Sequence, residues 1–361
     1  MFPLNTLIDS VSPFLSLNVK VATKNEYGEL KSVMLGRPEG ANWPTGDVFF
    51  DRMCNLSTYH KKLTRGPIPE KIIQEAREDL FYMRNVLRDH GVAVYRPEIV
   101  DHTKQSMHHQ CIENYSYLTT GMHSYSARDL ILTVGNMAIE CPTPYVSRYQ
   151  EFQAYDVVKQ EAIRDGCKWI AAPRARMESA ECMVKGAPAK VNLTERYPIF
   201  DAANVLKFDD KLLYMTSSTA NKTGAKWLQN VVGTEFEVIV WDDVYAHAHI
   251  DSTLISLNAD TILINATRVN NKDKLPTFLK DYKKIWIHEV AERDFYKYPY
   301  ASKWIGMNVL TINPETVMID PIQKDLKKQL GTKMEVVEAP LRHSRTLGGG
   351  HHCVTCDLER S

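Results

Sequence analysis

The sequence predicts an α/β protein built as one large domain, and two observations support that prediction. Short β-rich runs alternate with amphipathic helical segments along the 361 residues, and such alternation is typical of α/β folds. No Gly/Ser/Pro-rich linker separates one half of the chain from the other. We therefore expect a single domain over residues 21–361, preceded over residues 1–20 by an arm or a disordered leader.

The expected strands are short runs in which apolar, β-branched and aromatic residues dominate. They cover residues 32–35, 92–95, 130–134, 169–171, 212–215, 236–241, 261–265, 285–288, 309–312 and 334–337. A further run at 316–319 follows 309–312 after a turn that contains Pro314, which predicts a hairpin. The local unit is therefore strand, strand, helix, strand. No residue-level repeat of fixed period reveals how many such units the chain contains.

The clearest helix is expected to begin near Pro69 and to stop at Gly91. Its apolar residues recur at three-to-four spacing, at positions 72, 73, 76, 80, 83 and 87, so the helix is amphipathic and covers a sheet. Further helices are expected at residues 156–164, 219–232, 274–282 and 323–330, each followed within a few residues by a strand.

Composition and charge favour a soluble globular protein of a reducing compartment with a small-molecule partner. Lys plus Arg equals Asp plus Glu at 44 each, so nothing in the charge balance indicates nucleic acid or an anionic membrane. The longest apolar stretches, such as residues 261–266, fall far short of the roughly 20 residues of a membrane helix. The first residues lack the basic region of a secretory signal, and the seven cysteines are odd in number. We therefore expect a cytoplasmic protein with free thiols.

The strongest chemical motif lies close to the C-terminal end, where residues 347–357 read LGGGHHCVTCD. A thiol at Cys353, beside backbone amides and two histidines, could ionise at neutral pH and act as a nucleophile. Two alternatives stay open: a small buried structural cysteine, or a zinc or redox pair with Cys356. A tetrahedral zinc site is disfavoured, because the sequence has no second CxxC and His351 and His352 lie too close to both cysteines.

A nucleophilic thiol needs a base, and the motif AHAHID at residues 246–251 supplies the best candidate in His249. Asp251 lies two positions later, so on an extended backbone both side chains would point to the same side. Asp201, which is followed by two alanines, could approach a histidine and hold its tautomer, although a turn or cap role is the alternative. Asp129 stands at the mouth of the apolar run 130–134.

Taken in order, these motifs closely resemble the glycine and inosamine amidinotransferase family. The resemblance rests on FDAA at 200–203, HID at 249–251, SKWIGMNVL at 302–310 and GGGHHCVTCD at 348–357, and it extends to NEYGELKSVMLG at 25–36. It also includes RD at 128–129 with VGNMAIE at 134–140, so only about the first twenty residues lie outside it. This family adopts a five-bladed α/β propeller of ββαβ modules, the guanidine-modifying enzyme fold, which the resemblance implies for this chain.

The resemblance also implies roles for the candidate residues. Cys353 matches the nucleophile, His249 the proton shuttle and Asp201 the partner of that histidine, while Asp129 and Asp251 match the pair of carboxylates that holds the guanidinium. The implied reaction takes an amidino group from L-arginine through a covalent thiouronium intermediate, releases ornithine and passes the group to a primary-amine acceptor. It needs no metal and no cofactor, and a cytoplasmic homodimer is implied with it.

Four further positions follow from the same resemblance. Arg268 matches the arginine that binds the α-carboxylate of the donor, and Ser302 matches a serine of the donor site. Glycine-specific members carry Asn and Met at the places of Ala246 and Ala248, so the two alanines should enlarge the acceptor side of the pocket. We therefore expect an acceptor larger than glycine, such as an amine of a natural-product or toxin pathway like those of streptomycin, cylindrospermopsin or saxitoxin.

Three other functions are weighed against this one. An arginine deiminase-like hydrolase would use the same residues and let water resolve the thiouronium, and a glycine amidinotransferase would make guanidinoacetate. From a different class, a catalytically silent guanidine-binding protein could keep the fold. The motifs FDAA and GGGHHCVTC favour the transferase, because deiminases usually carry EGGD instead of FDAA.

Overall fold

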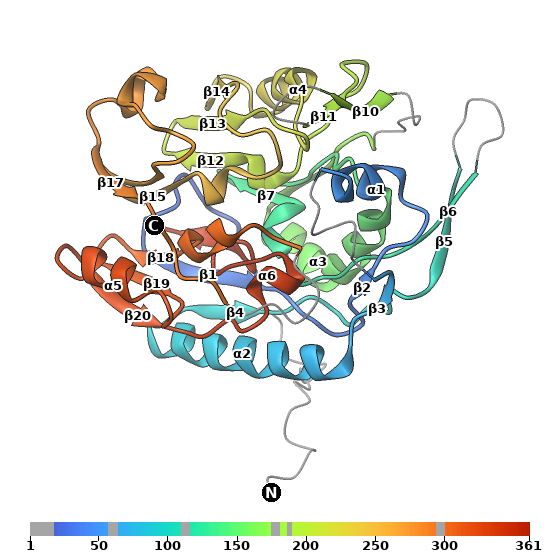
Figure 1. Ribbon diagram of the computed structural model, residues 1–361, viewed down its shortest axis with the longest axis horizontal. Coiled ribbons are helices and arrows are strands. Elements are labelled where there is room, and N and C mark those ends of the chain that lie inside the picture. The colour runs from blue at the N-terminus through green and yellow to red at the C-terminus, as the bar shows by residue number, and fades with distance from the viewer. Residues whose placement is uncertain (1–17, 57–63, 110–115, 175–180, 186–189, 294–299) are drawn as a thin grey trace, which may run out of the picture.

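The computed structural model describes residues 18–56, 64–109, 116–174, 181–185, 190–293 and 300–361, and its dominant feature is a set of similar small sheets (Figure 1). Within the described residues, five three-stranded sheets share one pairing scheme, in which an antiparallel pair is extended by a parallel third strand. Four of them are formed by β7 (Ile131–Val134), β8 (Met137–Glu140) and β9 (Lys168–Ala171); β12 (Val205–Phe208), β13 (Lys211–Met215) and β14 (Glu237–Trp241); β15 (Leu254–Asn258), β16 (Thr261–Asn265) and β17 (Lys283–Ile287); and β18 (Leu310–Asn313), β19 (Thr316–Ile319) and β20 (Glu335–Glu338).

The remaining three-stranded sheet joins distant parts of the chain. Its central strand β1 (Leu30–Leu35) pairs in parallel with β4 (Ala93–Tyr95) and antiparallel with β21 (Thr355–Arg360), the last strand of the protein. The pair Met34 and Cys356 stands in register between β1 and β21. The strand that follows Cys353 is therefore anchored by the beginning of the chain.

Helices cover the outer strands of these sheets. Helix α2 (Glu70–Asp89) packs against β4 and runs along one side of the molecule, and its apolar face joins the core cluster around Leu35 (Figure 1). Helices α3 (Asp156–Arg164), α4 (Lys222–Val232) and α5 (Lys324–Leu330) take the same place beside β9, β14 and β20. Each such helix lies between the second and third strands of its sheet in sequence, as the strand, strand, helix, strand unit predicts.

Shorter elements complete the described chain. Helices α1 (Val48–Cys54) and α6 (Ser344–Leu347) lie in connections, and three two-stranded ribbons are formed by β2 (Asn42–Trp43) with β3 (Gly66–Pro67), β5 (Gln105–His109) with β6 (Ser116–Thr120), and β10 (Cys182–Lys185) with β11 (Lys190–Leu193). The β5–β6 ribbon projects from the body (Figure 1). No described helix is long and apolar enough to cross a membrane.

Most predicted elements are confirmed, and one helix is wrong. Every predicted strand overlaps an observed one, and the helices at 156–164, 219–232 and 323–330 and the one from Pro69 to Gly91 are present. The helix expected at 274–282 is replaced by two 3-10 turns, Lys272–Lys274 and Thr277–Leu279. Pro276 stands between them with ψ 146° and no N–H to donate, so it breaks the helical pattern.

The predicted N-terminal arm lies outside the described residues as far as position 17. Its last residues do pack onto the domain. Val19 is buried, and Lys20 forms an ion pair with Glu359 of β21 at 2.6 Å.

The positioning of side chains depends on short turns that lead into the first strand of a sheet. The 3-10 turns Ala127–Asp129, Ala202–Asn204, Ile250–Ser252 and Lys303–Met307 precede β7, β12, β15 and β18. Each turn of this series contacts the next one. Cys353 lies in the turn that precedes β21. The sheets therefore bring the predicted site residues, which are far apart in sequence, to one place.

Candidate active site

The thiol of Cys353 is held in a tight turn whose glycines permit close approach of the backbone. A Cβ at Gly350 would lie 2.7 Å from Asn308, and Gly348 ends α6 with φ +78°, a conformation that favours glycine. The N–H of Cys353 donates to Oδ1 of Asn308 at 3.0 Å. The Cys353 side chain is 2% exposed, and its Sγ donates to Oδ2 of Asp251 at 3.1 Å.

The free protein keeps this thiol protonated. Burial, with the negative charges of Asp251 and Asp129, raises the pKa of Cys353 well above its usual value. The lowered pKa that the glycine-rich motif suggests is therefore absent in the unliganded site. Ionisation must await a positive charge near the sulfur.

His249 lies between two carboxylates. Its Nε2 is 2.9 Å from Oδ2 of the fully buried Asp201, and its Nδ1 is 3.6 Å from Oδ1 of Asp129. Burial acts to lower the pKa of His249, but the charges of Asp129 and Asp201 outweigh it and raise the pKa to about 9. At neutral pH the ring is therefore an imidazolium, a proton donor already in place beside the thiol.

Asp129 and Asp251 differ in their surroundings. Burial acts to raise the pKa of Asp251, but the hydrogen bond from His352 and the nearby charges lower it to about 2. Burial dominates at Asp129 and raises its pKa, although His249 and Arg148 act in the opposite direction. The extended backbone considered for His249 and Asp251 holds for His249, with φ −86° and ψ 155°, but not for Asp251, which lies in the 3-10 turn Ile250–Ser252. The turn nevertheless brings both side chains to the same cavity.

A cavity of about 430 Å³ joins these groups, since Cys353, His249, Asp129 and Asp251 all line it. Aromatic side chains form part of the wall, and they are Tyr145, Tyr245 and Tyr300. The wall also contains three charged side chains, Glu292, Lys303 and Arg345. Nη1 of Arg345 lies 2.6 Å from Oε2 of Glu292. Because Glu292 and Lys303 are half-exposed, this group marks the side of the cavity that faces solvent.

The remaining predicted positions divide into two kinds. Ser302 and Ala248 line the cavity, whereas Arg268 and Ala246 do not. The guanidinium of Arg268 lies 3.4 Å from the centre of the Tyr245 ring and donates to Ser252 and Thr253. Since Tyr245 lines the cavity, Arg268 stands one side chain behind the wall.

Sequence reasoning missed three residues of the site, and two of them, Arg148 and Asn308, hold it together. Arg148 donates from Nη1 to Oδ2 of Asp129 at 2.8 Å and makes a two-pronged ion pair with Glu151 at 2.8 and 2.9 Å. Asn308 bridges the backbone N–H of Cys353 and the backbone carbonyl of Asp251. Asn308 lies within the motif at 302–310, whereas the sequence signal for Arg148 was only its pair with Glu151 at i, i+3 within an aromatic-rich run.

His123 is the third missed residue. Its side chain is 2% exposed and lines the cavity, and neither ring nitrogen has a hydrogen-bond partner among the described residues. Burial and the charge of Arg148 lower the pKa of His123 well below its usual value, although the backbone of Leu347 acts in the opposite direction. The cavity wall therefore contains a neutral imidazole whose hydrogen-bonding capacity is unused.

The zinc or redox pairing of Cys353 with Cys356 finds no support in the arrangement of the two side chains. Cys356 Sγ faces the backbone carbonyl of Ile131 at 3.4 Å, within a buried apolar cluster, whereas Cys353 faces the cavity. Across the ranges that the structure describes, no three His, Cys, Asp or Glu side chains are grouped to hold a metal.

Sequence comparison identifies relatives over nearly the whole chain, although no family model matches it. Inosamine-phosphate amidinotransferase 1 of Streptomyces griseus is 36% identical, over 94% of this chain and 97% of its own length. Mitochondrial glycine amidinotransferase of Xenopus tropicalis is 30% identical over 94% of this chain and 83% of its own. L-arginine:L-lysine amidinotransferase of Pseudomonas savastanoi pv. phaseolicola is 29% identical, with 94% of each chain covered.

Solved structures agree with these relatives. The Streptomyces griseus enzyme superposes with a TM-score of 0.87, covering 95% of this chain and 97% of the other. An amidinotransferase of the saxitoxin biosynthetic pathway from Microseira wollei superposes with a TM-score of 0.84 at 27% identity, covering 94% and 97%. DDAH from Pseudomonas aeruginosa, at 13% identity, a TM-score of 0.56 and 91% and 98% coverage, shares the α/β fold alone. The chain is an enzyme that belongs to the amidinotransferase family.

Proposed function

We propose that this amidinotransferase takes the amidino group of L-arginine onto Cys353, releases L-ornithine and passes the group to a primary amine larger than glycine. The observation that supports it most directly is the presence of Cys353, His249, Asp129 and Asp251 on the wall of one cavity. Arginine as donor also agrees with the name of the Pseudomonas relative, an L-arginine:L-lysine amidinotransferase.

The two carboxylates provide the means to bind the donor. A guanidinium placed between Asp129 and Asp251 would donate charge-assisted hydrogen bonds from its fixed N–H groups to both carboxylates, which positions its carbon near Cys353. Ser302 can meet the α-carboxylate of arginine from the cavity wall. Direct binding of that carboxylate by Arg268 requires the Tyr245 ring to move aside.

Donor binding also activates the nucleophile. Asp129 and Asp251 help to keep the Cys353 thiol protonated, and the guanidinium cation offsets their charge. The thiol proton then leaves to solvent, and the thiolate forms a bond to the guanidinium carbon. The C–N bond to the δ-nitrogen of the future ornithine breaks as the His249 imidazolium donates its proton to that nitrogen. An amidino group remains on the sulfur as a thiouronium, and His249 is neutral.

The second half of the reaction runs the same steps in reverse with a different amine. Neutral His249 takes a proton from the acceptor as its nitrogen attacks the thiouronium carbon. The C–S bond breaks, the acceptor leaves as a guanidinium, and Cys353 is again a thiolate opposite a His249 imidazolium. Asp201 keeps the ring oriented throughout, since its carboxylate faces Nε2 at 2.9 Å.

An acceptor larger than glycine is supported by the cavity. Its volume of about 430 Å³ lies within the roughly 300–1,000 Å³ of small-molecule pockets, and Ala248 contributes only a methyl group to the wall. The neutral ring of His123 favours an acceptor with a further hydrogen-bonding group beyond the amine. A natural-product or toxin pathway is consistent with the Streptomyces and Microseira relatives.

The proposal extends to the whole protein. We take the five three-stranded sheets as the blades of a five-bladed α/β propeller, with residues 21–361 as one catalytic domain. The shared pairing scheme of the sheets and the β1–β21 pair support this arrangement. A cytoplasmic homodimer that acts without metal or cofactor completes the proposal.

The test is product analysis with arginine and a panel of amines, combined with mass spectrometry of Cys353. We expect release of ornithine, an amidino group on Cys353 when no acceptor is present, and guanidinylation of an amine larger than glycine. Cys353→Ser should reduce ornithine release about a thousandfold or more. Normal turnover by that variant would overturn the proposal, and citrulline with ammonia from arginine alone would make the protein a hydrolase. Efficient guanidinoacetate formation from glycine would overturn only the proposal that the acceptor is larger than glycine.

A further inference from the structure

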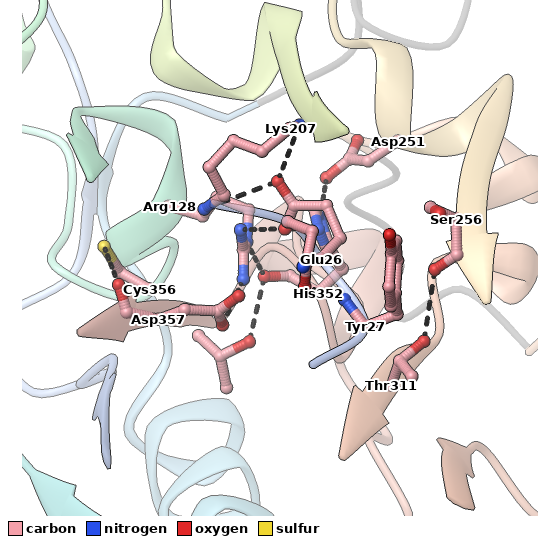
Figure 2. Close-up of polar contacts among 12 residues, drawn as sticks. Glu26, Tyr27, Arg128, Lys207, Asp251, Ser256, Thr311, His352, Cys356 and Asp357 are labelled. Atoms are coloured by element: carbon pink, nitrogen blue, oxygen red, sulfur yellow. Dashed lines mark hydrogen bonds and ion pairs between the residues drawn. The ribbon is translucent and has the colours of Figure 1, made fainter. Parts of the chain in front are cut away.

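Around His352, the residue before Cys353, lies a buried group of charged residues of which the reaction above uses only Asp251 (Figure 2). We propose that His352 is a positioning residue, held as an imidazolium between Glu26 and Asp251, which fixes the Asp251 carboxylate and supplies positive charge to the Cys353 thiolate. The inference rests on the proposed function, because it assumes that Cys353 is the nucleophile.

The contacts of the imidazole ring determine its protonation. His352 is 3% exposed, its Nδ1 lies 3.0 Å from Oδ2 of Asp251, and its Nε2 lies 3.4 Å from Oε2 of Glu26 (Figure 2). An ionised carboxylate accepts hydrogen bonds and cannot donate them. Both ring nitrogens must therefore carry a proton to satisfy both neighbours, and a ring with two N–H groups is an imidazolium.

Glu26 is ionised, because other cations hold its charge. Nη1 of Arg128 lies 3.0 Å from Oε2 of Glu26, and Nζ and the backbone N of Lys207 lie 3.4 and 3.1 Å from Oε1 (Figure 2). Burial acts to raise the pKa of Glu26, but Lys207 and Arg128 outweigh it and hold that pKa well below the usual range. The negative charge that faces Nε2 of His352 is thus a fixed feature of the interior.

A protonated His352 adds a positive charge that the Cys353 thiolate can match. The other charged residues of the group are all buried and sum to zero; they are the carboxylates Glu26, Asp251 and Asp357 and the cations Arg128, Lys207 and Arg360. A protonated His352 adds one positive charge, which leaves the group at plus one. The Cys353 thiolate brings the sum to zero. In an interior of low dielectric constant, a matched charge lowers the cost of ionising the thiol.

The same residue also fixes geometry. Oδ2 of Asp251 accepts from both His352 Nδ1 and Cys353 Sγ, so the ring is the partner that remains once the thiol ionises. Nε of Arg128 donates to the backbone carbonyl of His352 at 2.8 Å, and the backbone N–H of His352 donates to the carbonyl of Asn308 at 3.4 Å. Ring and backbone together hold Asp251 beside the nucleophile while the guanidinium binds.

The adjacent histidine supplies a matched control. His351 is 4% exposed, belongs to the same motif and places its Nε2 2.8 Å from the carbonyl of Ala339, without a contact to Asp251 or Glu26 in the described residues. His352→Gln keeps a side-chain N–H that can donate to Asp251 but removes the positive charge. Burial lowers the pKa of His351, so His351→Gln makes the same side-chain replacement at a neutral buried ring without a contact to Asp251 or Glu26 in the described residues.

The experiment follows two quantities across pH in each variant, the single-turnover release of ornithine from arginine and the rate of Cys353 alkylation by iodoacetamide. For His352→Gln we expect the alkylation profile to move by about one pH unit or more to higher pH, equal to a tenfold smaller thiolate fraction. Ornithine release should fall at least tenfold in kcat, with a smaller change in KM. His351→Gln should keep both profiles of the wild type.

Glu26→Gln provides a second arm if His352→Gln fails to fold. It leaves the ring in place but removes a carboxylate that favours a doubly protonated ring. Because the ring adjoins Cys353, loss of the ring's charge should outweigh loss of the Glu26 charge, so the alkylation profile should shift in the same direction by less than in His352→Gln. A folded His352→Gln or Glu26→Gln protein with the wild-type alkylation profile would overturn the inference. If Cys353→Ser still released ornithine, the proposed function itself would fail, which separates the two outcomes.

Discussion

At the scale of single residues, the free site holds a proton on both His249 and Cys353. The first chemical step requires that Cys353 lose its proton while His249 keeps its own. His249 is an imidazolium because Asp129 and Asp201 raise its pKa to about 9, and Cys353 is a thiol because burial and Asp251 raise its own. The guanidinium of a bound arginine lowers the pKa of the Cys353 thiol without removing the proton from His249. A thiolate and an acid are therefore present together only when arginine is bound, since His249 is already protonated and Cys353 ionises then.

The first prediction concerns Asp201→Asn, which removes one of the carboxylates that raise the pKa of His249. Ornithine release requires the imidazolium, so in the wild type its rate should fall as pH rises through about 9. In the variant the His249 pKa drops toward the usual value of about 6.5, and the rate should fall at correspondingly lower pH. Single-turnover ornithine release between about pH 6 and 10 measures this shift. The exposed Asp210→Asn serves as control, and a variant whose alkaline limb stays at the wild-type position contradicts the assignment.

The second prediction separates the two alanines of the AHAHID motif. Ala248→Met adds a flexible side chain to the cavity wall, so kcat/KM for a large acceptor should fall about tenfold or more while ornithine release changes less. Ala246→Met makes the same change at a residue that does not line the cavity, and its effect should be smaller. Steady-state kinetics with the acceptor found in the amine panel decide the matter. Equal losses in both variants would show that Ala248 does not set acceptor size.

The sequence reveals a site residue when its role can be read from the neighbouring residues of a short motif. Cys353 and His249 stand in short motifs whose residue types indicate chemistry, and the structure brings both to one cavity with the predicted Asp129 and Asp251. Arg148 and His123 have no such motif, because their importance arises from contacts with residues distant in sequence. The low reactivity of the free Cys353 thiol is likewise a property of the assembled charges, which no local pattern contains.

At the scale of elements, the turn before each strand does more than connect. The 3-10 turns that end at Asp129 and enclose Asp251 direct carboxylates into the cavity, while the strands behind them remain apolar and buried. Sequence reasoning identified the strands from their composition but considered extended backbone for both His249 and Asp251, which holds only for His249. Tight turns of three residues leave no periodic pattern, so their geometry could not be predicted. The helix expected at 274–282 failed for a related reason, since one proline outweighs the apolar spacing around it.

The third prediction concerns Asn221, which caps the start of α4 and also binds the backbone of the segment at residues 194–199. Asn221 caps α4 by accepting from Gly224 at 2.7 Å and also accepts from the N–H of Ile199, while its Nδ2 donates to Thr194 and Tyr197. Asn221→Ala leaves several of these buried groups without partners and should lower the free energy of unfolding by more than about 2 kcal/mol.

The matched control is Asn271→Ala, an exposed cap of a single 3-10 turn that accepts from Asp273 N at 3.0 Å. It should cost less than about 1 kcal/mol. Urea unfolding at constant m-value measures both. Similar losses in the two variants would mean that the cap of α4 contributes no more than an ordinary surface turn.

At the scale of the whole molecule, the first sheet and the nucleophile are assembled from opposite ends of the chain. β21 begins two residues after Cys353 and pairs with β1, and the buried ion pairs around Arg128 join the N-terminal segment, the turn before β7, β12 and β21 (Figure 2). The sequence predicted the strands and the site, but it did not predict that the first and last segments of the chain pair. Contacts between such distant segments depend on the complete fold, which local propensity does not encode.

Arg128 tests this assembly, because it joins the second sheet to both chain ends. Its guanidinium donates to Glu26 at 3.0 Å, to Asp357 at 2.6 Å and to the carbonyl of His352 at 2.8 Å, all in the interior. Arg128→Met leaves buried carboxylates unpaired and should lower the free energy of unfolding by about 3–5 kcal/mol. Arg164→Met, which breaks an exposed pair with Glu161 at 2.9 Å, should cost less than about 1 kcal/mol. Urea unfolding of both variants measures the difference. If Arg128→Met is as stable as Arg164→Met, the buried charges do not hold the two ends of the chain together, and β1–β21 pairing must suffice alone.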